Sequence, residues 1–146
     1  MLLTIEKVAT LKTVDIFADI PDFVLAAVAT IVEEVAMAPG ETFIQEGAIG
    51  DCMYVIVDGQ VRVHSRGRTI LFLGPGKSVG ELAVLDAEPR SASVTAVTDT
   101  LLFRIDKEPF DEVIADRPEI ARGIIRALCC RVRDVGRAMM AESSPE

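Results

Sequence analysis

Short apolar runs separated by glycine-containing turns fill the middle of this sequence. The clearest turn is Asp58-Gly59, which separates the apolar runs 53–57 and 61–65. An Asp-Gly dipeptide between two such runs is typical of a β-hairpin. Runs of this length predict strands, and two more strands are predicted at residues 91–97 and 101–105. Further turn signals lie at residues 39–40, 46–47, 50–51, 66–67 and 74–76.

The regular spacing of these strands favours a closed arrangement, because closure removes exposed strand edges. The predicted fold class is α+β and mainly β. We expect a β-roll, of the double-stranded β-helix or jelly-roll kind, flanked by N-terminal helices and a C-terminal hinge or lid helix. Ile5, Val8 and Leu11 predict a short first helix, and Pro21 is well placed as the first residue of a second.

The last third of the chain returns to helical periodicity. Residues 107–115 predict a short helix, and Pro118 begins a longer one that reaches about Met140. An apolar stripe on the longer helix must be covered by the roll, by a second copy of the chain, or by each in different ligand states. The stripe consists of Ile120, Ile124, Leu128, Val132, Val135 and Met139.

A single domain accounts for the 146 residues, of which 50% are hydrophobic. A chain of this size can bury an ordinary core without disulfides or metal. We divide it into an N-terminal helical segment at residues 1–34, the β-roll at 35–106, C-terminal helices at 107–140 and a disordered polar tail at 141–146.

Acidic residues are concentrated in the first part of the chain. The net charge is −8, and residues 1–60 carry ten acids and two bases. Because an acidic surface repels nucleic acid, we expect no nucleic-acid binding by this chain alone. No apolar run is long enough to span a membrane and the first residues do not resemble a signal peptide, so we expect a cytoplasmic protein. The three cysteines show no Cys-x-x-Cys spacing and are expected to be buried or idle thiols, without a redox or metal role.

One segment predicts a cradle for an anion. Gly80 allows the backbone to approach a ligand closely. A short helical turn beginning at Glu81 would direct the amide N–H groups of Leu82 and Ala83 toward a negative charge. Arg90 adds a planar guanidinium that can bind two phosphate oxygens at once.

Glu81 constrains the ligand further. Its carboxylate would repel a bound anion unless it faces a hydroxyl or amine of the same ligand. A sugar phosphate offers both groups, and a cyclic nucleotide fits, with its cyclic phosphate at Arg90 and its ribose 2′-hydroxyl at Glu81. Each residue alone has a common structural role, an ion pair for Arg90 and a helix-start carboxylate for Glu81. Only the two together predict a site.

The segment resembles the phosphate-binding cassette of cyclic nucleotide-binding domains, whose pattern runs Phe-Gly-Glu-x-Ala-Leu, a few variable residues, then Pro-Arg-x-Ala-x-Val. Val79 replaces the Phe and Val84 replaces the Leu, and both keep an apolar wall. The spacing from Glu81 to Arg90 resembles that of kinase regulatory subunits and is one residue shorter than in the bacterial catabolite activator protein. The resemblance extends over roughly residues 10–137. The matching positions are Gly80, Glu81, Ala83, Pro89, Arg90, Ala92 and Val94.

This resemblance implies a non-enzymatic sensor that binds a cyclic nucleotide and contains no metal or other cofactor. Arg90 and the amides of Leu82 and Ala83 would hold the cyclic phosphate, with the Ser91 hydroxyl and the Ala92 amide nearby. In the family, Thr after the arginine is associated with cyclic GMP and Ala with cyclic AMP. Ser91 lies between them, and we favour cyclic AMP.

The base would contact apolar strand residues, for which Val63 is the best candidate, with Val79 as a neighbouring wall. A residue of the final helix would close over it. No aromatic residue follows Phe110, so an aliphatic residue, a methionine or Arg131 is implied. Movement of this helix would be the output signal, and the same helix could form a homodimer. We expect the effector to be a separate partner or the remainder of a larger protein, such as a kinase, channel or transporter.

Other functions compete with this interpretation. A metal-dependent enzyme on a similar roll needs two or three histidines, whereas His64 is the only histidine here. A degenerate module could retain the fold for docking or dimerisation and lose the ligand, but the intact set of Gly80, Glu81 and Arg90 argues against this. A regulator of the catabolite activator type would need a helix-turn-helix domain, for which the chain leaves no room after the long helix.

Overall fold

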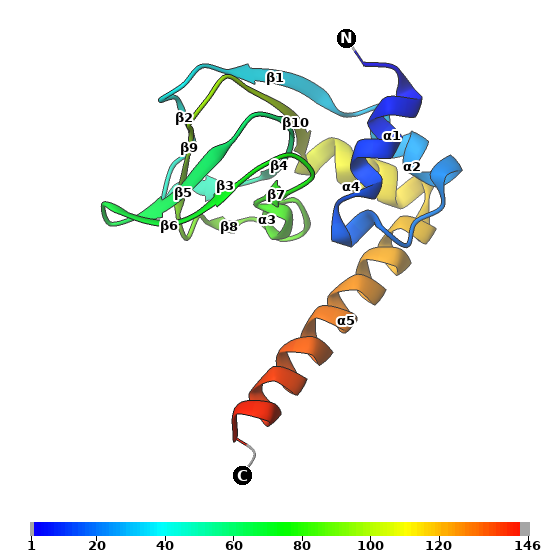
Figure 1. Cartoon of the computed structure of the whole chain (residues 1–146). Coiled ribbons are helices and arrows are strands. Elements are labelled where there is room, and N and C mark those ends of the chain that lie inside the picture. The colour runs from blue at the N-terminus through cyan, green and yellow to red at the C-terminus, as the bar shows by residue number, and fades with distance from the viewer. Residues whose placement is uncertain (1, 144–146) are drawn as a thin grey trace.

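Helices precede and follow a strand-rich middle along the chain, as the sequence predicts (Figure 1). The computed structural model describes residues 2–143. The N-terminal helices are α1 (Thr4–Lys12), the 3-10 turn η1 (Asp15–Phe17) and α2 (Asp22–Ala29). The strands are β1 (Glu33–Met37), β2 (Thr42–Ile44), β3 (Ile49–Gly50), β4 (Cys52–Asp58), β5 (Val61–Ser65), β6 (Arg68–Leu73), β7 (Ser78–Val79), β8 (Glu88–Pro89), β9 (Ser93–Ala96) and β10 (Thr100–Asp106). The remaining helices are α3 (Glu81–Leu85), α4 (Lys107–Asp116) and α5 (Pro118–Ser143). Helices α1, α2 and α4 lie together on one side of the strands (Figure 1).

The strands form two four-stranded antiparallel sheets that face each other as a roll. One sheet has the order β1-β10-β4-β7 and the other the order β2-β9-β5-β6. A small third sheet pairs β3 with β8. The hairpin predicted at Asp58-Gly59 is wrong, because β4 pairs with β10 and β7 while β5 pairs with β6 and β9. The turn itself is present, and it connects the two sheets as a corner of the roll.

The core has two parts, one inside the roll and one between the roll and the helices. The inner part includes Ile56, Val61 and Leu102, all 0% exposed. The outer part joins η1 and α4 to the sheet that contains β4 and β10, and the rings of Phe17 and Phe110 lie 6.1 Å apart within it. This second core attaches the helices to the roll next to α3.

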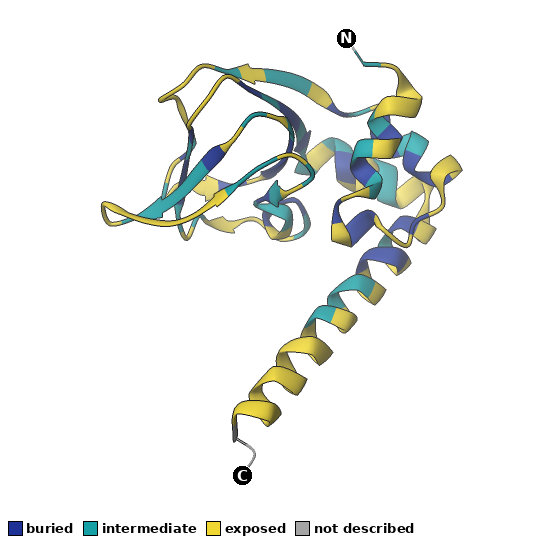
Figure 2. Cartoon of the chain, viewed as in Figure 1, coloured by how far each residue is buried: buried dark blue, intermediate teal, exposed yellow. Residues whose placement is uncertain are grey.

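The start of α5 is buried and its far end is not. Ile120 and Ile124 are 0% and 3% exposed, whereas Val132 is 71% and Val135 55% exposed (Figure 2). The predicted stripe is therefore covered by the rest of the chain only over its first half.

Two predicted boundaries differ from the structure. Pro21 is the residue before α2 and not its first residue, although its carbonyl still accepts hydrogen bonds from Val24 and Leu25. The tail predicted to be disordered from residue 141 is helical as far as Ser143, since Ala141 and Glu142 have high helix propensity. The rest of that predicted tail lies outside the described residues.

Candidate ligand-binding site

A cavity of about 590 Å³ opens between the predicted cassette and α5. Its walls are residues 80–83, 85–86 and 88–91, together with Leu128 of α5. A volume of 300–1,000 Å³ is usual for small-molecule sites. The cavity therefore has room for a nucleotide, and α5 forms part of its wall.

The backbone at Arg90 is fixed to a distant segment of the chain. The Arg90 amide donates to the Ala48 carbonyl at 2.8 Å, and the Arg90 carbonyl accepts from the Gly47 amide at 2.8 Å. Just before Arg90, β8 pairs with β3, which places Gly50 opposite Glu88. These contacts place Arg90 beside β3 and the turn that connects β2 to β3.

The Arg90 side chain lies between two glycines. An added Cβ at Gly50 or at Gly80 would lie within 3.0 Å of guanidinium atoms of Arg90. Gly80 also has φ +73°, a conformation in which a side chain would be strained. The cradle therefore requires glycine at both positions, although only Gly80 is predicted from the sequence.

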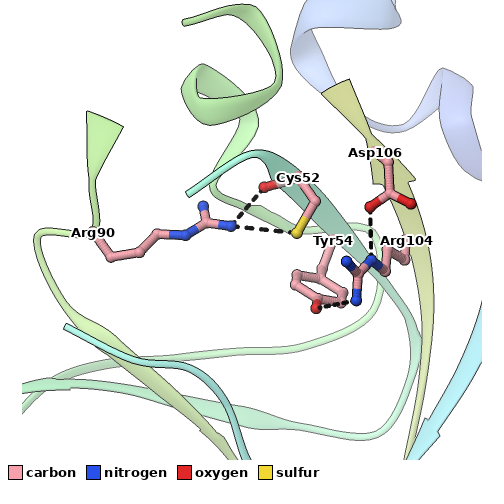
Figure 3. A network of polar contacts seen from close by, with 5 residues as sticks. All are labelled: Cys52, Tyr54, Arg90, Arg104 and Asp106. Carbon is pink, nitrogen blue, oxygen red and sulfur yellow. Dashed lines mark hydrogen bonds and ion pairs between the residues drawn. The ribbon is translucent and has the colours of Figure 1, made fainter. Parts of the chain in front are cut away.

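Arg90 forms no ion pair with any described residue. Its Nη2 donates to the carbonyl oxygen of Cys52 at 2.7 Å and to Cys52 Sγ at 3.4 Å (Figure 3). Its Nη1 is buried and has no hydrogen-bond partner within the described part of the chain. A buried donor without an acceptor costs about 1–3 kcal/mol, so an anion at this position would be stabilised.

Glu81 links the cassette to α5. It is the first residue of α3, and its Oε2 accepts a long hydrogen bond of 3.5 Å from Ser78 Oγ. Its Oε1 lies 3.2 Å from Nη1 of Arg131. The other guanidinium nitrogen, Arg131 Nη2, lies 2.7 Å from Asp15 Oδ2 in η1. One arginine of α5 therefore contacts both the candidate site and the N-terminal helices.

The Arg131 pairs are electrostatically favourable but partly solvated. The hydrogen bond to Asp15 is the main reason that the pKa of Arg131 is raised, and Glu81 adds to it. Because the Asp15 side chain is 67% exposed, its pair with Arg131 contributes only about 0–1 kcal/mol to stability. The ion pair between Arg131 and Asp15 is therefore weak enough to break when Arg131 or Glu81 forms new contacts with a ligand.

The sequence around this cavity is shared with known proteins. The sequence profile described as the cyclic nucleotide-binding domain matches residues 34–117. The chain belongs to the cyclic nucleotide-binding domain family.

Curated relatives of this cyclic nucleotide-binding domain include a CRP-like cAMP-activated global transcriptional regulator of Mycobacterium tuberculosis. It is 34% identical over 123 residues, which cover 81% of this chain and 55% of the regulator. The cyclic AMP receptor protein of Thermus thermophilus is 35% identical over 100 residues, covering 65% and 46% of the two chains. The domain thus spans about half the length of the curated relatives it matches.

Solved structures agree with the fold. The N-terminal domain of a transcriptional regulator from Streptomyces coelicolor A3(2) superposes with a TM-score of 0.84 at 30% identity, covering 94% of this chain and 99% of that domain. The regulatory domain of Toxoplasma gondii PKA, solved with cAMP, gives a TM-score of 0.69 at 28% identity, covering 76% and 44%. The predicted β-roll with flanking helices is confirmed.

The structure brings most of the predicted ligand residues of this cyclic nucleotide-binding domain to one cavity. Ser91 and Leu82 line it, and Leu82 is 55% exposed. Ala83 also lines it, but its amide donates to the Gly80 carbonyl at 3.0 Å and is therefore occupied. Ala92 follows the lining residues and is not part of the wall.

Three predicted contacts of the base do not line this cavity. Val79 is buried in the core of the roll, and Val63 packs against that core from β5. Arg131 contacts Glu81 and Asp15, while Leu128, one turn earlier, reaches the cavity. Leu128 belongs to the predicted apolar stripe and is an aliphatic residue, which is one of the three alternatives that the sequence left open for this contact.

A second polar network supports the strand behind Arg90. Arg104 Nε donates to Asp106 Oδ1 at 2.8 Å, and Arg104 Nη1 lies 3.5 Å from the Tyr54 hydroxyl (Figure 3). The guanidinium also lies 5.9 Å from the centre of the Tyr54 ring, a cation–π distance. Burial raises the pKa of Tyr54 to about 12, so Tyr54 stays neutral near pH 7. The network joins β10 to β4 and thereby positions Cys52, whose carbonyl binds Arg90.

The described residues form neither a metal site nor a membrane-spanning helix. Among residues 2–143, no group of three or more His, Cys, Asp or Glu side chains is placed to hold a metal ion. Within the same residues, none of the helices has the length and apolar character of a membrane span.

Proposed function

We propose that this domain is a non-enzymatic sensor of cyclic nucleotides that binds its ligand in the cavity between α3, β8 and α5. One observation carries the proposal: Arg90 lies between Gly50 and Gly80, has no carboxylate partner among the described residues, and has a buried Nη1 that lacks an acceptor. A cyclic phosphate supplies two oxygens to such a guanidinium. A small rotation of the side chain away from Cys52 would present it to the ligand.

Glu81 and Arg131 support the ribose assignment. A bare carboxylate beside a phosphate would weaken binding, and Arg131 offsets that charge from the side of α5 at 3.2 Å. Oε2 of Glu81 has only a 3.5 Å contact with Ser78 Oγ, so it can accept a shorter hydrogen bond from the ribose 2′-hydroxyl. Phosphate and ribose would then bind to two residues of the same cassette, Arg90 and Glu81.

Cyclic AMP is our preferred ligand. Ser91, which follows Arg90 and lines the cavity, offers a hydroxyl that is free to rotate, unlike a threonine hydroxyl, which the β-branch restricts. The names of two curated relatives specify cyclic AMP. Three further groups stay secondary candidates for ligand contacts: Val63, Val79 and the Ala92 amide. Because none of them lines the cavity, they could reach the ligand only if the roll closed onto the base.

Signalling would follow from α5. Its residues Leu128 and Arg131 contact the cavity wall and Glu81, so ligand occupancy changes the surroundings of the helix directly. A ligand shifts a conformational equilibrium by its difference in affinity for the two states. We expect the effector to be a further domain or a partner protein, and the location to be cytoplasmic.

Calorimetric titration tests this function. We expect heat of binding with cyclic AMP, weaker binding with cyclic GMP, and none with linear 5′-AMP. Arg90→Ala should weaken binding by roughly 30-fold or more, because removing one partner of a desolvated charge pair costs about 2–5 kcal/mol. Arg126→Ala is the matched control, since Arg126 is exposed on α5 away from the cavity.

The alternative is a degenerate module that docks or dimerises without a ligand. A folded wild-type protein that gives no heat with either cyclic nucleotide at millimolar concentration would establish that alternative. Equal affinity of wild type and Arg90→Ala would instead place the ligand elsewhere.

A further inference from the structure

The hairpin of β5 and β6 is an exposed edge of the roll that lies outside the ligand cavity. Its tip points away from the helices (Figure 1). In the sheet order β2-β9-β5-β6, β6 is the last strand, and no described strand pairs with its outer side. All residues of β6 except Leu73 are exposed, including Ile70 at 56% and Phe72 at 53%.

Such an edge is unusual for a protein that acts alone. Exposed edge strands are generally protected by inward charges, prolines or a covering segment, because their free N–H and C=O groups pair readily with another chain. Between residues 70 and 72 three large apolar side chains follow one another without interruption. Within β6 the only charged residue is Arg68, next to the tip, and the strand contains no proline. A register shift between Val63 and His64 interrupts the pairing with β5 at Ile70, but residues 71–73 pair regularly, so this part of the edge is open.

The charge of the hairpin differs from that of the rest of the chain. Residues 61–73 contain three arginines and one histidine and no acid, whereas the whole chain has a net charge of −8. Arg62 donates to Thr69 Oγ1 at 3.2 Å. Arg66 and Arg68 are exposed and form no ion pair with any residue of the described chain.

The turn itself keeps a basic residue at an unfavourable position. Arg66 is the only non-glycine residue with positive φ among those described, at 53°. The first position of such a two-residue turn favours asparagine, aspartate or glycine. Arginine there is strained, and both Arg66 and Arg68 are exposed.

We propose that β6 is a docking edge for an extended, acidic and apolar segment of a partner protein, which adds to the sheet as a further strand. The backbone of β6 would supply hydrogen bonds, Ile70 and Phe72 apolar contacts, and Arg66 and Arg68 partners for carboxylates. Charge complementarity selects this occupant over a second copy, because two basic hairpins paired edge to edge would leave their arginines uncompensated. The proposal does not depend on the ligand cavity, which β6 does not line.

Fluorescence polarisation with a defined probe tests the docking edge. The probe is a short fluorescein-labelled peptide in which glutamate alternates with valine, and its matched control carries lysine in place of glutamate. We expect saturable binding of the glutamate peptide only. The double variant Arg66→Glu/Arg68→Glu should weaken it by about tenfold. Arg126→Glu/Arg133→Glu, an equal charge change on α5, should leave it unchanged.

Backbone methylation separates strand addition from simple charge attraction. Methylating alternate amides of the glutamate peptide gives two versions, of which only one removes the N–H groups that face β6. Strand addition requires that one version binds like the parent and the other fails. Equal binding of both versions, or equal binding of the lysine peptide, overturns the proposal. So does an unaffected double variant, or binding to phosphatidylserine vesicles in place of the peptide.

Discussion

At the scale of single residues, Gly50 and Gly80 decide where the Arg90 guanidinium lies. Gly80 belongs to the cassette and has a positive φ, so a side chain there is strained by the backbone as well as by Arg90. Gly50 has no such φ, and the three atoms nearest to an added methyl group there all belong to the Arg90 side chain. A substitution at Gly50 therefore tests how the position of Arg90 affects ligand binding, and it disturbs the backbone less than a substitution at Gly80 would.

We expect Gly50→Ala to weaken cyclic nucleotide binding by about tenfold or more while the domain stays folded. The added methyl forces the guanidinium to move, and misplacing a charged hydrogen-bond donor costs about 1.5–3 kcal/mol. Titration calorimetry measures the affinity and circular dichroism checks the fold. Gly74→Ala is the control, because an added Cβ there meets nothing closer than 4.0 Å. Equal affinities of the two variants would contradict the assigned role of Gly50.

Ser91 offers a test of base preference at the same scale. We expect Ser91→Thr to shift preference toward cyclic GMP, because a fixed hydroxyl beside the phosphate can accept from the guanine 2-amino group in the syn orientation. One hydrogen bond is worth about 0.5–1.5 kcal/mol, so the ratio of the two affinities should change by a few-fold to tenfold. Ser91→Ala is the matched control and should not move toward cyclic GMP. An unchanged ratio in the threonine variant would remove Ser91 from the base contacts.

At the scale of elements, α5 connects the ligand site to the rest of the molecule. Leu128 forms part of the cavity wall, and Arg131 contacts Glu81 and Asp15 three residues later. Beyond these residues the helix is exposed (Figure 2). The helix is therefore anchored at one end and exposed to solvent over its last turns, a geometry in which small changes at Glu81 can move the far end.

Truncation after Leu128 should weaken nucleotide binding by roughly 5- to 150-fold without abolishing it, since the phosphate contacts remain and only the coupling to α5 is lost. Amide hydrogen exchange over residues 125–140 should slow when nucleotide is added to the full chain. Truncation after Met140 is the control, because it keeps Arg131 and the whole stripe. Arg131→Gln should reproduce part of the loss. Equal exchange with and without saturating nucleotide would make α5 a static part of the fold.

At the scale of the whole molecule, the exposed half of α5 indicates self-association. Its apolar residues repeat at alternating steps of three and four, which is the heptad pattern of a coiled coil. β-branched residues at the first position of each heptad favour two parallel strands. The residues of this seam are Ile125, Leu128, Val132, Val135 and Met139.

We expect the chain to dimerise through this seam. Val132→Glu/Val135→Glu should shift sedimentation equilibrium from dimer to monomer, because charged residues in the seam are desolvated without partners. Arg126→Glu/Arg133→Glu lies on the opposite face and should leave the dimer intact. A wild-type chain that sediments as a monomer at high micromolar concentration would rule out this interface. Docking of the acidic peptide at β6 should not change in either variant.

Much of the architecture follows from local sequence. Glycine turns between short apolar runs predict the strands, and helical periodicity predicts α1, α4 and α5 within a few residues. The cassette from Gly80 to Arg90 is also local, because a left-handed glycine, a short helix and a return strand follow one another along the chain. These features depend on neighbouring residues, whose geometry is set by backbone sterics and by the period of the apolar residues.

Contacts between distant segments were decided only by the tertiary structure. Gly50 and Cys52 surround Arg90 because β3 pairs with β8, and Arg131 meets Glu81 because the helical core docks α5 beside α3. Val63 and Val79 face the core and not the cavity, since strand register determines the face on which each side chain lies. Register and docking minimise the free energy of the whole core, so no short stretch of sequence specifies them.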